Sequence, residues 1–176
     1  MSTHCFVGTT DSANPHLVHA RFVRFGGHPG VVVPALAAIW VGHARRDAPA
    51  LNSAILASDW EYLDPAITAA TEPGFGGQRP VPGVGMTLAS TTDGAIETPE
   101  PVTVFPLSHA RHLDAEWIYL IDPLTATVAV HTDDGQHLAR YRLAGCLPPS
   151  PDATCTPASR SPAARYAPQP SPGALR

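Results

Sequence analysis

Proline sets the strongest limit on where this chain can form a packed structure. The sequence holds 20 prolines in 176 residues, and eight of them fall in residues 147–176. That segment has almost no large apolar side chains, so it buries too little surface to offset the entropy lost on ordering. We therefore predict a disordered Pro-rich tail at 147–176 and a loose segment at 1–15, which leaves a single folded domain at 16–146.

The charge pattern bears on the class of partner. The net charge is −4 with histidine neutral, and all 11 positive charges are arginine. Domains that bind duplex nucleic acid usually carry a basic surplus, so this class is possible but not favoured. The absence of lysine, together with abundant Ala, Gly and Pro, favours a GC-rich genome such as an actinobacterial one.

The sequence also bears on the compartment. It has no apolar run of about 18 residues, and its first residues have neither a basic start nor a long apolar block. The three cysteines, Cys5, Cys146 and Cys155, are too few and too irregularly placed for a disulfide framework. We predict a cytoplasmic protein that does not bind membranes.

The first half of the folded part predicts one strand and two helices. Residues 16–25 alternate and are rich in strand formers, and Gly26 and Gly27 end that strand. An apolar helix follows up to about residue 44, and we place its start near Val32 or Val33 because Pro34 is tolerated only in a first turn. A second helix runs from Asp47 to about residue 58, and residues 66–84 form a long loop.

The second half predicts strands. Short candidates lie at 86–89 and 102–105, and residues 116–144 alternate through three runs with an Asp-Gly turn at 133–135. We read these runs as a three-stranded antiparallel meander. The predicted fold class is α+β: an N-terminal strand, two helices, then an antiparallel sheet that ends in the meander.

The glycine turn between the first strand and helix suggests a phosphate site. A Walker loop needs a lysine, which this chain lacks, and the glycines at 26, 27 and 30 do not fit a dinucleotide fingerprint. Pro29 also removes one backbone donor. The segment is therefore interpreted as a sharp turn, with glycine supplying positive φ and proline the helix entry.

Two histidines and an aspartate are the candidate metal ligands. His109 and His112 are three residues apart, which puts both on one face of a short helix, and Asp114 is close in sequence. Zinc sites need three or four such donors, so these residues are the candidate metal site. The sequence has no G-x-S-x-G motif, and no cysteine lies in a defined turn beside a histidine, so we predict no catalytic residue and no cofactor.

Arginines and two aromatic residues are the candidate binding residues. Two arginines lie on the first predicted strand and two on the last; if these strands pair, their guanidinium groups line one sheet face and can hold an anion or an acidic partner. Trp60 and Tyr62 follow the second helix, where exposed aromatics often contact a partner protein. The arginines concerned are Arg21, Arg24, Arg140 and Arg142.

The strand–glycine–helix segment resembles that of small uncharacterised proteins of phages, plasmids and actinobacterial genomes. Their pattern reads aromatic-R-x-D-G-Y-P-x-x-V-G-P-x-L, and this chain matches it at Arg24, Gly27, Pro29, Val33, Pro34 and Leu36. A later W-x-Y-x-x-D strand is similar at Trp117, Tyr119 and Asp122. Gly26 and His28 replace the usual Asp and Tyr. The resemblance spans about residues 20–143 and implies no established activity or site.

Three functional hypotheses follow. The first is a small cytoplasmic binding or regulatory protein of an accessory or mobile-element locus, with an unidentified protein partner. The second is a metal-dependent enzyme that uses the His109 and His112 region. The third is a nucleic-acid-binding protein that uses the arginine-lined sheet face.

Overall fold

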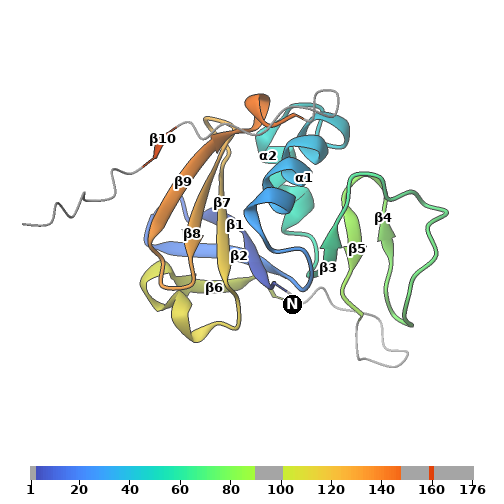
Figure 1. Ribbon diagram of the computed structural model, residues 1–176, viewed down its shortest axis with the longest axis horizontal. Coiled ribbons are helices and arrows are strands. Elements are labelled where there is room, and N and C mark those ends of the chain that lie inside the picture. The colour runs from blue at the N-terminus through green and yellow to red at the C-terminus, as the bar shows by residue number, and fades with distance from the viewer. Residues whose placement is uncertain (1–2, 90–100, 148–158, 161–176) are drawn as a thin grey trace, which may run out of the picture.

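The computed structural model describes residues 3–89 and 101–147, and the backbone of 159–160. They form one large mixed sheet with two α-helices against one of its faces (Figure 1). The strands are β1 (Cys5–Thr10), β2 (Leu17–Val23), β3 (Trp60–Leu63), β4 (Pro80–Val81), β5 (Gly85–Thr87), β6 (Thr103–Pro106), β7 (Trp117–Asp122), β8 (Thr127–Thr132), β9 (His137–Arg142) and β10 (Ser159–Arg160). The helices are α1 (Pro29–Gly42), α2 (Ala48–Ile55) and the 3₁₀ helices η1 (Leu107–His112) and η2 (Leu143–Gly145).

The sheet mixes parallel and antiparallel neighbours. Its order is β10-β9-β8-β7-β1-β2-β3-β5-β4, and β6 pairs with β2 off this path. The pairs β1/β7 and β2/β3 are parallel, and the remaining pairs are antiparallel. The expected α+β class is confirmed, and the sheet is mixed because the two parallel pairs join β1 and β2, which precede the helices, to strands that follow them.

The N-terminal segment is not loose, contrary to the sequence-based expectation. Residues 5–10 form β1, which lies in the interior of the sheet between β7 and β2. Its side chains are buried on both faces: Cys5 and Val7 pack in the core beneath the helices, and Phe6 packs in a second core on the opposite face. Burial on both faces explains why this short strand shows no polar alternation.

The main core lies between the sheet and the two α-helices. Leu36, Ile39 and Leu51 from the helices are fully buried, and so is Trp60 from β3. Strands β7 and β8 contribute alternate residues to the same core: Tyr119, Ile121, Val128 and Val130. Among the described residues, no helix has the length and apolar character needed to cross a membrane.

Helix α1 begins earlier than the position of Pro34 led us to expect. His28 caps it, because its Nδ1 atom accepts a hydrogen bond of 3.1 Å from the backbone N–H of Gly30. Pro29 occupies the first helical position, where its missing N–H costs nothing. The cap fixes the start at Pro29 and leaves Pro34 inside the helix, so the expected start near Val32 or Val33 is wrong.

The glycine turn before α1 is confirmed as an architectural turn. Gly26 has a φ of +74°, and a side-chain carbon on Gly27 would lie 2.7 Å from the carbonyl oxygen of Thr3. The Gly27 N–H donates to that same oxygen, and the Gly27 carbonyl accepts from the Tyr119 hydroxyl at 2.6 Å. These groups hold the turn against the sheet, so they are not directed at a ligand.

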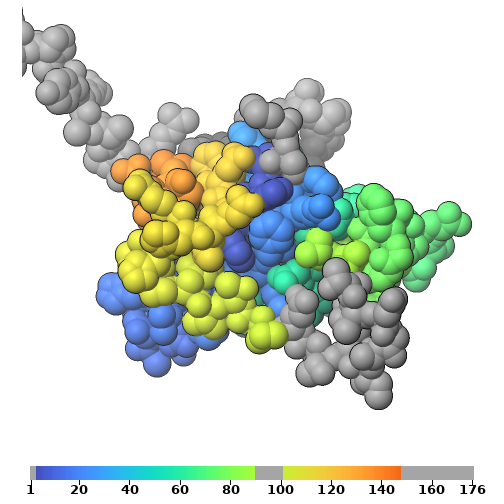
Figure 2. All heavy atoms as spheres, turned by 90° about the horizontal axis from the view of Figure 1, so that it is seen from below, coloured from blue at the N-terminus to red at the C-terminus, as the bar shows by residue number. Residues whose placement is uncertain are grey.

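A smaller core lies on the sheet face opposite α1 and α2. Helix η1 covers part of this face through Ala110, and Phe105 from β6, which extends the sheet beside β2, packs on Phe6, Val18 and neighbouring residues. The rings of Phe6 and Phe105 meet edge to face at 5.4 Å between their centroids. In Figure 2, the yellow-green segment of β6 and η1 lies on the surface beside the blue first strands.

The C-terminal meander is confirmed. Strands β7, β8 and β9 pair in sequence order, and Gly135 takes a φ of +79° in the turn between the last two. Two small differences appear upstream, because residues 60–63 form β3 and residues 80–81 of the expected loop form β4. The predicted tail at 147–176 lies outside the described residues except for Leu147 and β10.

Candidate functional site: a polar groove beside the central strands

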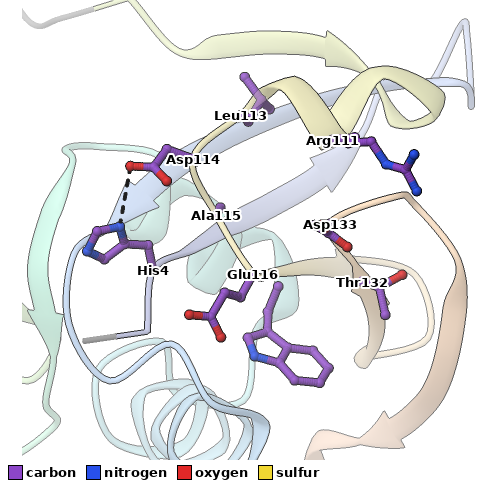
Figure 3. Close-up of a pocket in the computed structure, with 9 residues that line it drawn as sticks. His4, Arg111, Leu113, Asp114, Ala115, Glu116, Thr132 and Asp133 are labelled. Atoms are coloured by element: carbon purple, nitrogen blue, oxygen red, sulfur yellow. Dashed lines mark ion pairs between the residues drawn. The ribbon is translucent and has the colours of Figure 1, made fainter. Parts of the chain in front are cut away.

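A groove of about 570 Å³ opens where the parallel strands β1 and β7 begin and where β8 ends. Its polar and aromatic lining comes from three separate parts of the chain: His4, Arg111, Asp114, Glu116, Trp117, Thr132 and Asp133. Figure 3 shows His4 and Asp114 on one side of this groove and Arg111 on the other. We call these residues the polar groove.

Backbone pairing places the lining residues. The N–H of Glu116 donates to the His4 carbonyl at 3.0 Å, which extends the β1/β7 pairing by one step beyond the strands. Trp117 pairs with Thr132 across the β7/β8 ladder. The loop between η1 and β7 then carries Asp114 over the groove entrance, where its carboxylate lies 3.9 Å from Nδ1 of His4.

The turn after β8 forms the other wall. The Thr132 hydroxyl donates to the carboxylate of Asp134, and the Gln136 N–H donates to the same group. These hydrogen bonds, with a smaller effect from the Arg111 charge, lower the pKa of Asp134 below its ordinary value. The Thr132 hydroxyl is therefore used within the turn, whereas the adjacent Asp133 is exposed and lines the polar groove.

The polar groove carries an excess of negative charge. Asp114, Glu116 and Asp133 supply three carboxylates, against the single guanidinium of Arg111. The carboxylate-bearing residues are all exposed, while Trp117 is half-buried and adds an aromatic surface. This combination suits a cation, because carboxylates attract it and an aromatic face stabilises it.

The predicted metal residues lie near this groove without forming a cluster. His109 and His112 are exposed on η1, where the 3₁₀ geometry puts residues three apart on one side. Asp114 faces His4 instead. In residues 3–89 and 101–147, no group of three or more His, Cys, Asp or Glu side chains is placed to hold a metal ion.

The structure separates the four predicted arginines into two groups. Three strands lie between β2 and β9, so the condition for one continuous strip is not met. Arg21 is buried on the helix side, where its Nε donates to the Leu56 carbonyl at 2.8 Å, and Arg24 lies 3.8 Å from the Glu61 carboxylate. Arg140 and Arg142 are exposed on β9.

The two predicted aromatic residues have different positions. Trp60 is completely buried, and its indole N–H donates to the Ile55 carbonyl at 2.8 Å. Tyr62 lines a second, apolar groove of about 550 Å³ between α1 and β3, together with the exposed Phe25 and Val31. Only Tyr62 therefore remains available to a ligand.

Three groups with strongly shifted pKa values lie inside the protein. Burial raises the pKa of the Cys5 thiol and of the Tyr119 hydroxyl, both in the main core. Burial lowers the pKa of His131 to about 4, with smaller effects from His137 and Arg140. None of these three residues lines the polar groove.

Sequence reasoning found only Asp114 as a site residue in the polar groove. His4 falls in the segment expected to be loose, and the sequence around Asp133 predicts only a tight turn. Glu116 and Trp117 look like the start of an ordinary strand. His4 joins the other three because β1 pairs in parallel with β7, and no local pattern in the sequence indicates that pairing. Asp133 is brought beside Trp117 by the antiparallel β7/β8 ladder of the predicted meander.

Comparison with known proteins adds no assignment: no family model, curated protein or solved structure matches this chain.

Proposed function

We propose that this chain is a small binding protein that uses the polar groove to hold a basic side chain of a protein partner. The observation that carries the proposal is the convergence of Asp114, Glu116 and Asp133 beside Trp117 in one groove. Guanidinium and ammonium groups are the cations that proteins present most often, and carboxylates bind them through charge-assisted hydrogen bonds.

The shape of the groove favours a side chain of a macromolecule over a small free ligand. Small-molecule sites bury most of their ligand and are mainly apolar. Here the charged walls are exposed, and Arg111 stands opposite Asp114, so both signs of charge are offered along the groove. A peptide segment that carries a basic residue beside an acidic or polar one complements this arrangement.

The test is a titration of the full chain with two capped peptides that differ only in the charge of two side chains. The first contains two arginines, and the second contains citrulline at both places, which keeps the shape and removes the charge. We expect the arginine peptide to bind with a dissociation constant that rises with salt, and the citrulline peptide to bind at least about tenfold more weakly.

Variants locate the binding. Glu116→Gln combined with Asp133→Asn removes two groove charges from exposed positions, and we expect at least about fivefold weaker binding of the arginine peptide. Glu72→Gln is the matched control, because Glu72 is exposed and does not line the groove. Equal binding of both peptides, or equal effects of the groove and control variants, would refute the proposal.

A further inference from the structure

The strand β9 presents a partly filled edge of the sheet. On one side it pairs with β8 over five residue pairs. On the other side, within the part of the chain that the structure describes, Ala139 and Arg140 alone pair, with Arg160 and Ser159 of β10. The ladder with β8 shifts register at Leu138, which marks a bulge in β9. Residues 139–142 therefore form the regular part of this edge, which we call the β9 edge.

The segment that supplies β10 is limited in how much of this edge it can cover. Pro157 and Pro162 flank it in the sequence. Proline has no N–H to donate to a ladder, so regular pairing of this segment is confined to the residues between them.

The charge along the β9 edge selects the kind of strand that fits it. Arg140 and Arg142 are exposed, and they stand opposite Ala129 and Thr127 in the ladder, which puts them on the sheet face away from α1 and α2. Asp122 and His131 are the titratable groups influenced by Arg140.

We propose that the β9 edge binds an extended acidic segment of a partner protein by strand addition, and that β10 competes with that segment. Antiparallel pairing in the register of β10 puts alternate residues of the partner opposite Arg142 and then Arg140. A segment with the pattern acidic–apolar–acidic–apolar pairs its carboxylates with both guanidinium groups and turns its apolar residues toward the side of Tyr141.

This surface is distinct from the polar groove in position and in charge. None of the residues of the β9 edge lines the polar groove. The proposed ligand of the β9 edge is acidic, whereas the proposed ligand of the polar groove is basic. Failure of either proposal therefore leaves the other unaffected.

The experiment measures binding of a capped, labelled peptide Thr-Glu-Val-Glu-Val-Thr to the full chain by fluorescence anisotropy. A second peptide has the same sequence with alternate backbone nitrogens methylated, which removes ladder donors and keeps the charge. We expect the methylated peptide to bind at least about tenfold more weakly. Equal binding of the two peptides would overturn strand addition.

Two sets of variants test the charge and the competition. Arg140→Glu with Arg142→Glu is expected to weaken binding at least about tenfold, with Arg140→Gln and Arg142→Gln as a milder pair. Arg79→Glu is the control, since Arg79 is exposed and directly precedes β4, which lies at the opposite end of the sheet order from β9. An equal effect of the control variant would show attraction by net charge alone, and would overturn the proposal.

Ser159→Pro combined with Arg160→Pro removes the backbone N–H donors of β10. We expect this variant to bind the peptide at least about fivefold more tightly, because the fraction of molecules with an open edge rises. Unchanged affinity would overturn the competition. A single-stranded oligonucleotide serves as the last probe: if it binds with the same dependence on Arg140 and Arg142 while the acidic peptide does not bind, the edge recognises nucleic acid and the proposal is wrong.

Discussion

Single residues hold backbone strain at the end of α1. Arg46 has a φ of +65°, in the left-handed region that is costly for residues with a side-chain carbon. Its N–H donates to the Trp40 carbonyl at 2.7 Å, which keeps the residue in this conformation, while its side chain is exposed. We expect Arg46→Gly to raise the free energy of unfolding by about 1 kcal/mol in urea titrations. Arg46→Ala retains the strain, so a similar gain in that control would contradict this explanation.

A second prediction at this scale concerns His131. Its pKa is about 4 in the folded protein, chiefly because it is buried, and the ring of His137 at 5.3 Å and Arg140 also favour the neutral form. An unfolded histidine titrates near 6.5. Between pH 6.5 and pH 4, His131 is protonated in the unfolded chain and neutral in the folded chain. The folded state is therefore most stable above pH 6.5, and its stability declines as the pH falls toward 4.

We expect the free energy of unfolding to decrease over that interval by on the order of 2 kcal/mol through His131. The measurement is urea unfolding at a series of pH values, with the parent compared with His131→Leu. The variant should show a shallower decline toward pH 4. His16→Gln, at an exposed position, is the control. Parallel curves for the parent and His131→Leu would rule out this group as the cause.

At the scale of elements, α1 contains an internal proline that a helix tolerates poorly. Pro34 lies in the second turn, where it cannot donate to the carbonyl four residues earlier. We expect Pro34→Ala to raise the free energy of unfolding by about 1 to 3 kcal/mol in urea titrations. Pro29→Ala is the matched control, because Pro29 stands at the first helical position, and it should give no gain.

Elements with a strong local period were predictable from the sequence. The alternation of residues 116–144 and the Asp-Gly turn led directly to the meander, and the apolar stripe of α1 indicated a helix. The predicted start of α1 is wrong because proline usually occurs in a first turn, whereas the His28 cap starts this helix a full turn before Pro34. Strand β1 was missed because CFVGTT is short, contains glycine and buries both of its faces.

The candidate sites were harder to predict than the elements. The His4 side of the polar groove depends on the parallel pairing of β1 with β7, and that pairing joins segments far apart in the sequence. The separation of Arg21 from Arg140 has the same origin, since strand order is a long-range property that local alternation does not encode. Sequence patterns therefore indicated the residue types of the sites more reliably than their grouping.

For the whole molecule, the position of β1 determines whether the sheet holds together. It pairs with β2 on one side and with β7 on the other, and it contributes to both cores. We expect a chain that lacks residues 1–12 to lose cooperative thermal unfolding. A synthetic peptide of residues 1–12 added to that chain should restore the transition. A peptide of the same composition with residues 5–10 scrambled is the control, and cooperative unfolding of the shortened chain alone would contradict the central role of β1.

The same strand has a consequence for the order in which the protein is completed during synthesis. Phe6 leaves the ribosome before its parallel neighbour Ile118, which is made only after both α-helices and strands β3 to β6. Until then one side of β1 has no strand beside it, and the backbone groups there are open to pairing with other nascent chains. The interval between these two residues is therefore the period in which a newly made chain is most exposed to misassembly.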